Sequence, residues 1–476
     1  MRNGGGWAWY RKGEGRFSLA SSPRAWLLLL AVAAASFGLA AEAWLAGTVA
    51  LFANPKVGRC LLPFDADDPR LEDRLGQAYK DVNPVECLRH LRRATELSPA
   101  SRLYWSDLES TCEALGDAQS ADRARERLLQ LCPMTPAYHW LVADSCLRAN
   151  RIPQAFEHFR RLLELDPTYA LSVWSSLQSL AQPEHVFQQV VADNPQAELK
   201  IGYIDFLSDQ GESAAAYRLW RRVAADTPSF SFSAAAPYLD RLIAQGRFEE
   251  AVEVWKDLTR LRVIETPRAD LAGPFSDLPP HARPAWPEAR TDGSGLGASS
   301  SSFAPVSAPG SAPVNLIFNG DFEQAPLLAG FDWRTFPATY LAVDFSAPGA
   351  YHGAHCLRVD FTVSRNDEFE PAYQIVPVLP RHAYRLEGFV RSQDITSDTG
   401  PCLRVSDTQA GGFPNALSET TVGTTPWHPV RMSFSTGAKT RAVRVSFWRP
   451  RSRAFPTEIS GTAWLDSVSL RSEPSP

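Results

Sequence analysis

Asp466, near the C-terminus, lies in a strand-like stretch where its carboxylate is expected to face the core and to need a partner. Asp466 has the same parity as Val468 and Leu470 in a stretch of alternating residues, so it points to the inward face of a strand. An isolated charge is costly to bury, so this carboxylate must be paired, hydrogen-bonded or bound to a metal ion. Two interpretations stay open: Asp466 binds a cation, or it accepts hydrogen bonds from backbone amides of the first strand of its domain.

The sequence lacks the short motifs of common catalytic centres. It has no GxSxG elbow, no HExxH, no P-loop and no dinucleotide-binding fingerprint attached to a strand. The glycines of segment 293–297 follow no strand and precede no helix, and the acidic run 367–370 is typical of a solvated loop. We therefore expect a protein that is not an enzyme. A pair of carboxylates in a glycoside-hydrolysing cleft is the alternative that motifs do not test.

Charge and cysteine usage narrow the possible partners. The net charge is −5, and no basic stripe runs along any segment, so nucleic-acid binding is not expected. The seven cysteines form no CxxC and have no histidine pair at zinc spacing. Cys356 and Cys402 are the cysteines of the C-terminal domain, and whether they form a disulfide stays open.

The N-terminal region indicates where the chain resides. Residues 1–24 carry five basic residues and one acidic residue, and 25–53 is almost wholly apolar or small, long enough for a transmembrane helix. The positive-inside rule makes 1–24 a cytoplasmic tail and exports the bulk to the periplasm or another extracytoplasmic space. Two alternatives remain: a signal segment cleaved at Ala41-Glu42-Ala43, or a buried helix of a soluble protein.

A repeat of 34 residues follows the apolar segment. Pro99, Pro133 and Pro167 each end an amphipathic stretch, and Ala121 and Ala155 keep the same spacing. The pattern resembles the tetratricopeptide repeat (TPR), a helix pair whose landmarks include the Leu75-Gly76-x-Ala78-Tyr79 motif. About five or six units are expected over 65–263, with a degenerate register after Pro167. Such an all-α solenoid would bind a protein partner on its concave face.

Composition changes twice after the repeats. Residues 264–313 are rich in Pro, Ser and Gly and are expected to form a flexible linker. From 314 to 472 the apolar period becomes two, as in Leu357, Val359 and Phe361. About eight or nine short strands separated by turn residues predict an all-β sandwich.

The two ends of the 314–472 segment resemble galactose-binding-like jelly rolls, a group that includes many carbohydrate-binding modules. Segment 315–323 (NLIFNGDFE) is similar to their opening strand, and 463–470 (AWLDSVSL) is similar to their closing strand. The resemblance implies a structural calcium ion, with Asp321, Glu323 and Asp466 as candidate ligands.

The same resemblance implies saccharide binding through exposed aromatic rings. The candidates are Trp333, Tyr340, Tyr373 and Trp448, with Arg449 in a cationic loop beside them. The sequence thus predicts an N-terminal transmembrane helix, a helical-repeat solenoid and a jelly-roll sandwich. We expect a membrane-anchored scaffold that holds a protein partner and a saccharide. A role in bacterial envelope polysaccharide or surface-protein assembly follows by analogy from this architecture alone. The alternatives are a protein–protein adaptor whose jelly roll binds no sugar, and a glycan-active enzyme.

Overall fold

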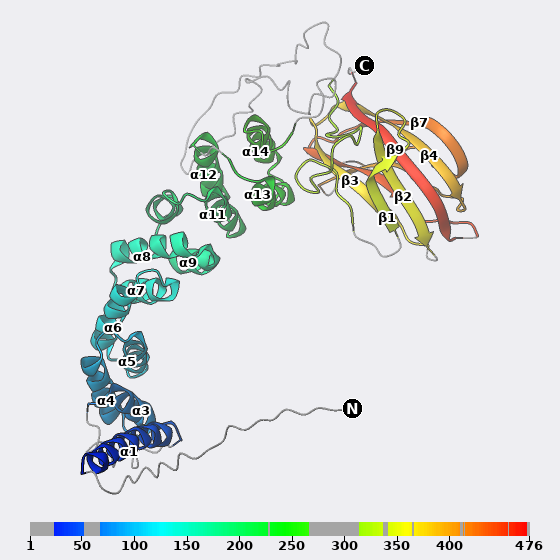
Figure 1. The fold of residues 1–476 in the computed structure, drawn as a ribbon. Coiled ribbons are helices and arrows are strands. Elements are labelled where there is room, and N and C mark those ends of the chain that lie inside the picture. Colours follow the sequence, from blue (N-terminus) through cyan, green and yellow to red (C-terminus); the bar gives the residue numbers. More distant parts are fainter. Residues whose placement is uncertain are drawn as a thin grey trace, which may run out of the picture. The chain divides into compact units, whose positions relative to one another are not determined.

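Figure 1 shows the computed structural model of the 476-residue chain. The structure describes the backbone of residues 23–51, 67–226, 229–265, 314–336, 341–363, 366–409, 413, 415–455 and 457–473. Two predicted segments lie largely outside the described residues. They are the linker, apart from residues 264–265, and the cytoplasmic tail, apart from residues 23–24. Two compact units, Met1–Pro167 and Thr168–Pro476, are described one at a time.

The predicted apolar segment forms helix α1 (Pro23–Leu51), and its side chains are described over 26–40. Trp26, Leu30 and Phe37 of this stretch are exposed. Within the described residues, no helix is both long enough and apolar enough to cross a membrane.

The first unit contains helix pairs at the predicted period. The pairs are α3 (Pro69–Tyr79) with α4 (Pro84–Leu97), α5 (Arg102–Ala114) with α6 (Ala118–Leu131), and α7 (Pro136–Arg148) with α8 (Ile152–Leu165). Pro99, Pro133 and Pro167 follow the second helix of each pair within two residues, as expected for a residue that cannot continue a helix. The prediction of a helical region built from pairs is confirmed.

Small residues set how closely these helices pack and turn. A Cβ at Gly76 would lie 2.6 Å from the side chain of Leu91, so α3 and α4 approach where glycine leaves room. Gly116 ends α5 with φ 74°, and Asn150 has φ 56° at the same place one repeat later. Glycine and asparagine are the residues that best tolerate this left-handed conformation at a helix C-terminus.

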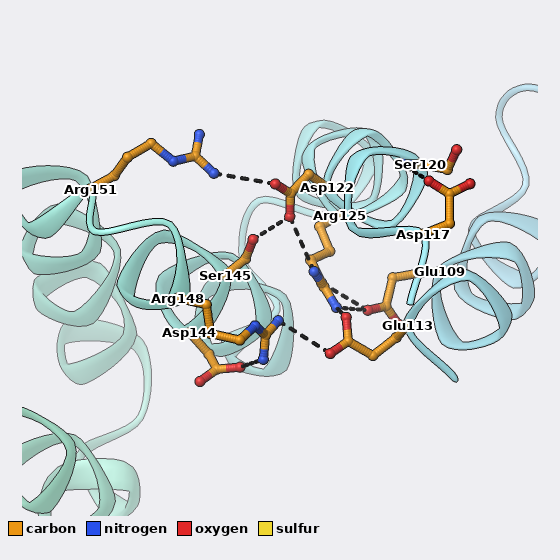
Figure 2. Close-up of polar contacts among 10 residues, drawn as sticks. All are labelled: Glu109, Glu113, Asp117, Ser120, Asp122, Arg125, Asp144, Ser145, Arg148 and Arg151. Atoms are coloured by element: carbon orange, nitrogen blue, oxygen red, sulfur yellow. Dashed lines mark hydrogen bonds and ion pairs between the residues drawn. The ribbon is translucent and has the colours of Figure 1, made fainter. Parts of the chain in front are cut away.

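A buried arginine joins the second and third helix pairs (Figure 2). Arg125 of α6 is 3% exposed, and its Nε donates to Glu109 Oε1 of α5 at 2.8 Å. The same guanidinium pairs with Glu113 and, at 3.2 Å, with Asp122. Asp122 in turn accepts the Ser145 hydroxyl of α7, so the network crosses from one repeat to the next. Removing one partner would leave buried charge uncompensated, so the network fixes how these repeats stack.

The second unit begins with a less regular part of the repeat. Its helices are α9 (Ala170–Leu177), α10 (Pro183–Val186), the π-helix η3 (Phe187–Val191), α11 (Ala197–Asp209), α12 (Ser213–Asp226), α13 (Phe232–Ala244) and α14 (Phe248–Arg260). The short α9 and the π-helical turn explain why the proline spacing contracts after Pro167. Trp174 and Trp220 are buried among the helices, as expected for core residues.

Within the described residues of the C-terminal part, nine strands form two antiparallel sheets (Figure 1). They are β1 (Leu341–Pro348), β2 (His355–Val363), β3 (Phe369–Pro377), β4 (Ala383–Ile395), β5 (Cys402–Asp407), β6 (Ala416–Leu417), β7 (Gly423–Ser435), β8 (Ala442–Arg449) and β9 (Ile459–Ser472). The sheet orders are β1-β2-β9-β4-β7 and β3-β8-β5-β6. Residues such as Leu357, Val390, Val445 and Leu465 of both sheets share one apolar core, so the predicted sandwich is confirmed.

The predicted opening strand over 315–323 is wrong. The segment forms turns, with φ 49° at Asn319 and 55° at Phe322, conformations that a strand does not contain. It is nevertheless fixed to β9, because the Leu316 amide donates to Leu470 O at 2.8 Å and Asn315 Oδ1 accepts the Leu470 amide at 2.9 Å. The segment therefore closes the core with side chains while lacking strand geometry.

Candidate functional site

The outer face of the four-stranded sheet carries two of the predicted saccharide-binding residues. Tyr373 of β3 and Trp448 of β8 lie next to core residues Ala372 and Phe447 in their strands, so alternation turns both rings away from the core. Tyr373 lies opposite Ser446 in the β3–β8 register. Both rings are half-buried. The sheet register thus brings to one face two aromatic residues that are far apart in the sequence.

Glu370 is the electrostatic centre of this face. It accepts hydrogen bonds from Arg404 Nη2 at 2.8 Å and from Arg444 Nη1 at 2.9 Å, and the Ser446 hydroxyl donates to the same carboxylate. The Glu370 side chain is only 8% exposed, so it depends on these partners. The carboxylate therefore holds one guanidinium from β5 and one from β8 in fixed positions above the sheet.

Each of these arginines also lies over one aromatic ring. The Cζ of Arg444 is 4.3 Å from the centre of the Tyr373 ring, and the Cζ of Arg404 is 3.4 Å from the centre of the Trp448 ring. These are cation–π distances. Arg404 therefore covers one face of the Trp448 ring, while Tyr373 also stacks on Phe336 at 5.1 Å.

A cleft of about 660 Å³ opens onto this face. Its lining from the sandwich consists of Arg334, Tyr373, Ile375, Arg404, Ser406, Asp407, Thr408, Gln409 and Arg444. Its lining from the helices consists of Asp240, Ile243, Ala244, Gln245, Gly246 and Phe248, around the α13–α14 turn. The volume is in the range of small-molecule sites, and the lining combines a few apolar side chains with many hydrogen-bonding groups.

The helical wall of the cleft is held by specific contacts. Asp240 of α13 accepts the Gly330 amide at 2.8 Å and pairs with Arg334 Nη2 at 2.5 Å. Trp255 of α14 packs edge-on against Phe318 at 5.1 Å and Phe331 at 5.7 Å between ring centres. These contacts lie inside the second compact unit, so the cleft has one wall from the last helix pair and one from the sandwich.

Two predicted saccharide-binding residues are buried, and the expectation that they are exposed is wrong. The Trp333 side chain has no exposed surface and donates from Nε1 to Asn319 O at 2.9 Å, which places it in the core beneath the turn segment. Arg449 is also fully buried. It donates to Asp367 O at 2.8 Å and Thr457 O at 3.0 Å, so it ties loops together. Tyr340 lies outside the described residues.

Two of the three predicted calcium ligands, Asp466 and Glu323, bind the loop that precedes β2. Asp466 is buried and its Oδ2 accepts the amides of Tyr351 at 2.8 Å and His352 at 2.9 Å. Glu323 Oε1 accepts the amides of Ala354 at 2.7 Å and His355 at 2.9 Å. The prediction that Asp466 accepts backbone amides is therefore right in kind, but the amides belong to this loop and not to a first strand.

Among the described residues, no group of three or more His, Cys, Asp or Glu side chains is placed to hold a metal ion. Burial raises the pKa of Asp466 to about 6, partly opposed by the amides and assisted by the charge of Asp321. The backbone amides already donate hydrogen bonds to carboxylate oxygens of Glu323 and Asp466 that calcium would need as ligands. Calcium binding therefore stays a prediction, which a direct test must decide. Cys356 and Cys402 are both free and buried, so they form no disulfide.

The residues that the sequence analysis missed are the charged ones. Arg444 lies in a predicted strand, whereas the solvated loop predicted for 367–370 is wrong, because Glu370 lies in β3 with a largely buried side chain. Glu370, Arg404 and Arg444 each follow a core residue in their strands. Alternation could have placed each on the outer face. Their meeting depends on the register between β3, β8 and β5, which sequence spacing does not determine.

Comparison with known proteins yields structural likenesses only. No protein-family model and no curated protein matches the chain. A structure of MamA is 12% identical over 44% of this chain and 86% of MamA, with a TM-score of 0.22. A family 16 carbohydrate-binding module is 17% identical over 33% of this chain and 99% of the module, with a TM-score of 0.24.

Two further likenesses are of the same kind. The structure of a CBM4 module is 15% identical over 33% of this chain and 99% of that module, with a TM-score of 0.25. A MamA mutant is 23% identical, with a TM-score of 0.21, and this chain covers 66% of its length, slightly less than two thirds. Because all these TM-scores are low, the helical region and the sandwich are assigned from the elements and contacts described above.

Proposed function

We propose that this protein is a non-catalytic scaffold whose sandwich binds a saccharide in the cleft between the four-stranded sheet and the α13–α14 turn. The observation that carries the proposal is the lining of that cleft. Tyr373 offers the rim of an aromatic ring that Arg444 and Phe336 also contact, and Arg404, Arg444 and Gln409 offer planar hydrogen-bonding groups around it. Sugars present C–H faces to aromatic rings and hydroxyls to such groups, so the lining matches a saccharide better than a wholly apolar ligand.

The charges of the cleft favour a neutral saccharide. Glu370 binds both Arg404 and Arg444, and Asp240 binds Arg334, so positive charge is met by negative charge on both walls. Charged side chains that are already paired still offer donors and acceptors to hydroxyl groups. An anionic ligand would gain little here because it would compete with Glu370 for the same guanidinium groups.

The carboxylates of the cleft support binding without catalysis. Asp240 is held by Arg334 and the Gly330 amide, and Asp407 accepts the Thr440 hydroxyl and the Gln409 amide. A catalytic acid needs a raised pKa and a free path to the substrate. Carboxylates fixed by cations and amides serve better as positioned hydrogen-bond acceptors.

The helical and N-terminal regions complete the proposed scaffold. Paired helices in series form the kind of surface that holds a protein partner, and we assign that role to the repeats. The apolar side chains described along α1 are exposed, and basic residues precede this helix in the sequence. Both features support a membrane anchor with the bulk of the chain extracytoplasmic.

The test is a binding measurement on the full chain, purified in a detergent whose headgroup is not a sugar. A neutral-glycan array selects a ligand, and calorimetry then compares the wild type with Tyr373→Ala. We expect a loss of affinity of about tenfold or more, because the substitution removes the aromatic ring that lines the cleft and holds Arg444 in place. Tyr373→Phe keeps the ring and is expected to retain binding. Tyr351→Ala, which removes an exposed tyrosine from the loop before β2, is the matched control.

The alternative is a protein–protein adaptor whose sandwich binds no sugar. The observation that favours it is the cover over one candidate ring, since Arg404 lies against Trp448. A folded wild-type chain that binds no neutral glycan, or binding that Tyr373→Ala leaves unchanged, would overturn the saccharide cleft and favour the adaptor.

A further inference from the structure

The outer face of the five-stranded sheet carries a row of alternating cations and indoles. Trp464 of β9 lies opposite Arg358 of β2 and opposite Arg391 of β4. The Cζ of Arg391 is 4.0 Å from the centre of the Trp464 ring and 5.3 Å from that of Trp427 on β7. Arg358 lies 5.9 Å from the Trp464 ring centre. The row therefore crosses four adjacent strands, with Arg391 between two indoles.

Arg391 differs from the other stacked arginines in its electrostatic environment. Arg358 is bound by Asp360 at 2.9 Å, and Arg404 and Arg444 are bound by Glu370. Within the described part of the chain, Arg391 has contacts to aromatic rings and no hydrogen bond or ion pair to an acceptor. Its Nε is buried without a hydrogen-bond partner. The half-buried guanidinium of Arg391 therefore stacks on two indoles, but its positive charge has no carboxylate as a counter-ion.

The buried carboxylate in the same region does not complete it. Asp466 lies close enough to influence the same thiol, Cys356, as Arg391 does. Its oxygens, however, accept the amides of Tyr351, His352 and Ser467. Asp466 thus fixes the loop beside the row and leaves the positive charge of Arg391 without a hydrogen-bonded counter-ion.

That loop presents an aromatic ring next to the row. Tyr351 stacks on Phe389 with 3.7 Å between ring centres and meets Trp427 edge-on at 6.2 Å. Tyr351 is nevertheless 49% exposed. Phe389 covers one face of the tyrosine ring, so the exposure is on the side away from the sheet. A flat apolar surface and an uncompensated guanidinium therefore lie side by side.

We propose that this face is a second binding site, specific for an anionic saccharide of the uronic-acid class. The sugar carboxylate binds the guanidinium of Arg391, and the pyranose ring lies against Tyr351. The occupant follows from charge complementarity: a carboxylate supplies the acceptor that Arg391 lacks, and a sugar ring matches the exposed tyrosine face. The site uses neither Tyr373 nor the cleft, so it is independent of the neutral-saccharide site proposed above.

The test uses the full chain in the same sugar-free detergent, with trigalacturonate and its carboxyl-reduced form as probes. We expect the wild type to bind trigalacturonate, with an affinity that falls as salt is added, and to bind the reduced trisaccharide at least about tenfold more weakly. Arg391→Gln is expected to abolish this preference for the carboxylate, and Arg391→Lys to retain part of it. Arg358→Gln, whose guanidinium already has Asp360, should change the affinity much less.

Several results would overturn the second site. They are equal binding of the charged and reduced trisaccharides, no loss of affinity in Arg391→Gln, or a loss of trigalacturonate binding in Tyr373→Ala that places the ligand in the cleft. Circular dichroism confirms that each variant is folded. Because Tyr373→Ala tests the cleft and Arg391→Gln tests this face, failure of one proposal is distinguishable from failure of the other.

Discussion

Asp240 of the last helix pair binds both the amide of Gly330 and the side chain of Arg334, and so joins α13 to the turn segment of the sandwich. The same pair of elements walls the cleft proposed to bind saccharide. The consequence is that the sandwich cannot present the whole site by itself. Residues around the α13–α14 turn supply six of the fifteen residues that line the site.

The Gly330 position tests this joint. Gly330 has φ 62°, and a Cβ there would lie 2.5 Å from Trp255 and 2.7 Å from Leu239. Gly330→Ala is therefore expected to separate the helix pair from the sandwich and to weaken neutral-saccharide binding, with both folds retained. Hydrogen exchange should show faster exchange in α13, α14 and 318–334.

Gly423 supplies the matched control for that change. Its φ is 66°, but a Cβ there would meet nothing within 4 Å. Gly423→Ala carries the same backbone strain without the clash, so it should leave exchange in α13 and α14 unchanged. Equal effects of the two substitutions would mean that strain, and not the contact with Trp255, explains the result.

Glu370 is expected to be essential to the stability of the sandwich. Glu370→Ala leaves Arg404 and Arg444 without their shared carboxylate, and breaking a largely buried ion pair costs about 3–5 kcal/mol in the free energy of unfolding. Urea unfolding followed by tryptophan fluorescence measures the loss. Glu387→Ala, which removes a more exposed pair with Arg431, should cost less than about 1 kcal/mol. Similar losses for both variants would contradict the central role of Glu370.

Asp73 in the first unit predicts a pH dependence. Burial and the nearby Asp107 raise the pKa of Asp73 to about 7, with Arg74 opposing the shift. An acid whose pKa is higher in the folded state loses stability as the pH rises from its unfolded value through its folded value. Asp73→Asn should therefore raise the urea midpoint of the helical signal, by an amount that grows between about pH 4 and pH 7 and then levels off. Asp67→Asn, at an exposed position, is the control, and a pH-independent effect of Asp73→Asn would contradict the shift.

Asp466 allows the structural role and the calcium prediction to be separated. Asp466→Asn removes a charged acceptor of the Tyr351 and His352 amides, so we expect the Tm of the sandwich to fall whatever metal is present. The calcium prediction adds that EDTA lowers the Tm of the wild type and that calcium restores it. A Tm that EDTA leaves unchanged would contradict the ion and leave the amide contacts as the whole role of Asp466.

The sequence predicted the parts of the fold that depend on local periodicity. The 34-residue proline spacing predicted helix ends near Leu97, Leu131 and Leu165, because proline acts on the helix immediately before it. Alternation predicted the strands, but the inward direction predicted for Asp466 is wrong. A register shift at Ser467, which has φ 51°, places Asp466 opposite Phe389 on the outer face, beside the core pair Val390 and Leu465. Arg449 has the parity of Val445 and Phe447, so alternation indicates its burial, whereas the neighbouring arginines suggested an exposed loop.

Contacts between distant segments could not be predicted in this way. The four partners of Arg449 come from loops, and the meeting of Glu370 with Arg404 depends on strand register. The burial of Trp333 follows from the turns at Asn319 and Phe322, where the sequence alone indicated a strand. The helical wall of the cleft depends on contacts between residues before 266 and residues after 313. Contacts between segments so far apart in the sequence leave no local pattern that would predict them.

Hydrogen exchange on the full chain with and without a neutral oligosaccharide tests the central claim most directly. The cleft predicts ligand-dependent protection in two separate segments, 373–375 with 404–409 of the sandwich and 240–248 of the last helices. Tyr373→Ala should remove the protection in both segments together. Protection confined to other surfaces, or saccharide binding with no change in either segment, would contradict the proposed cleft.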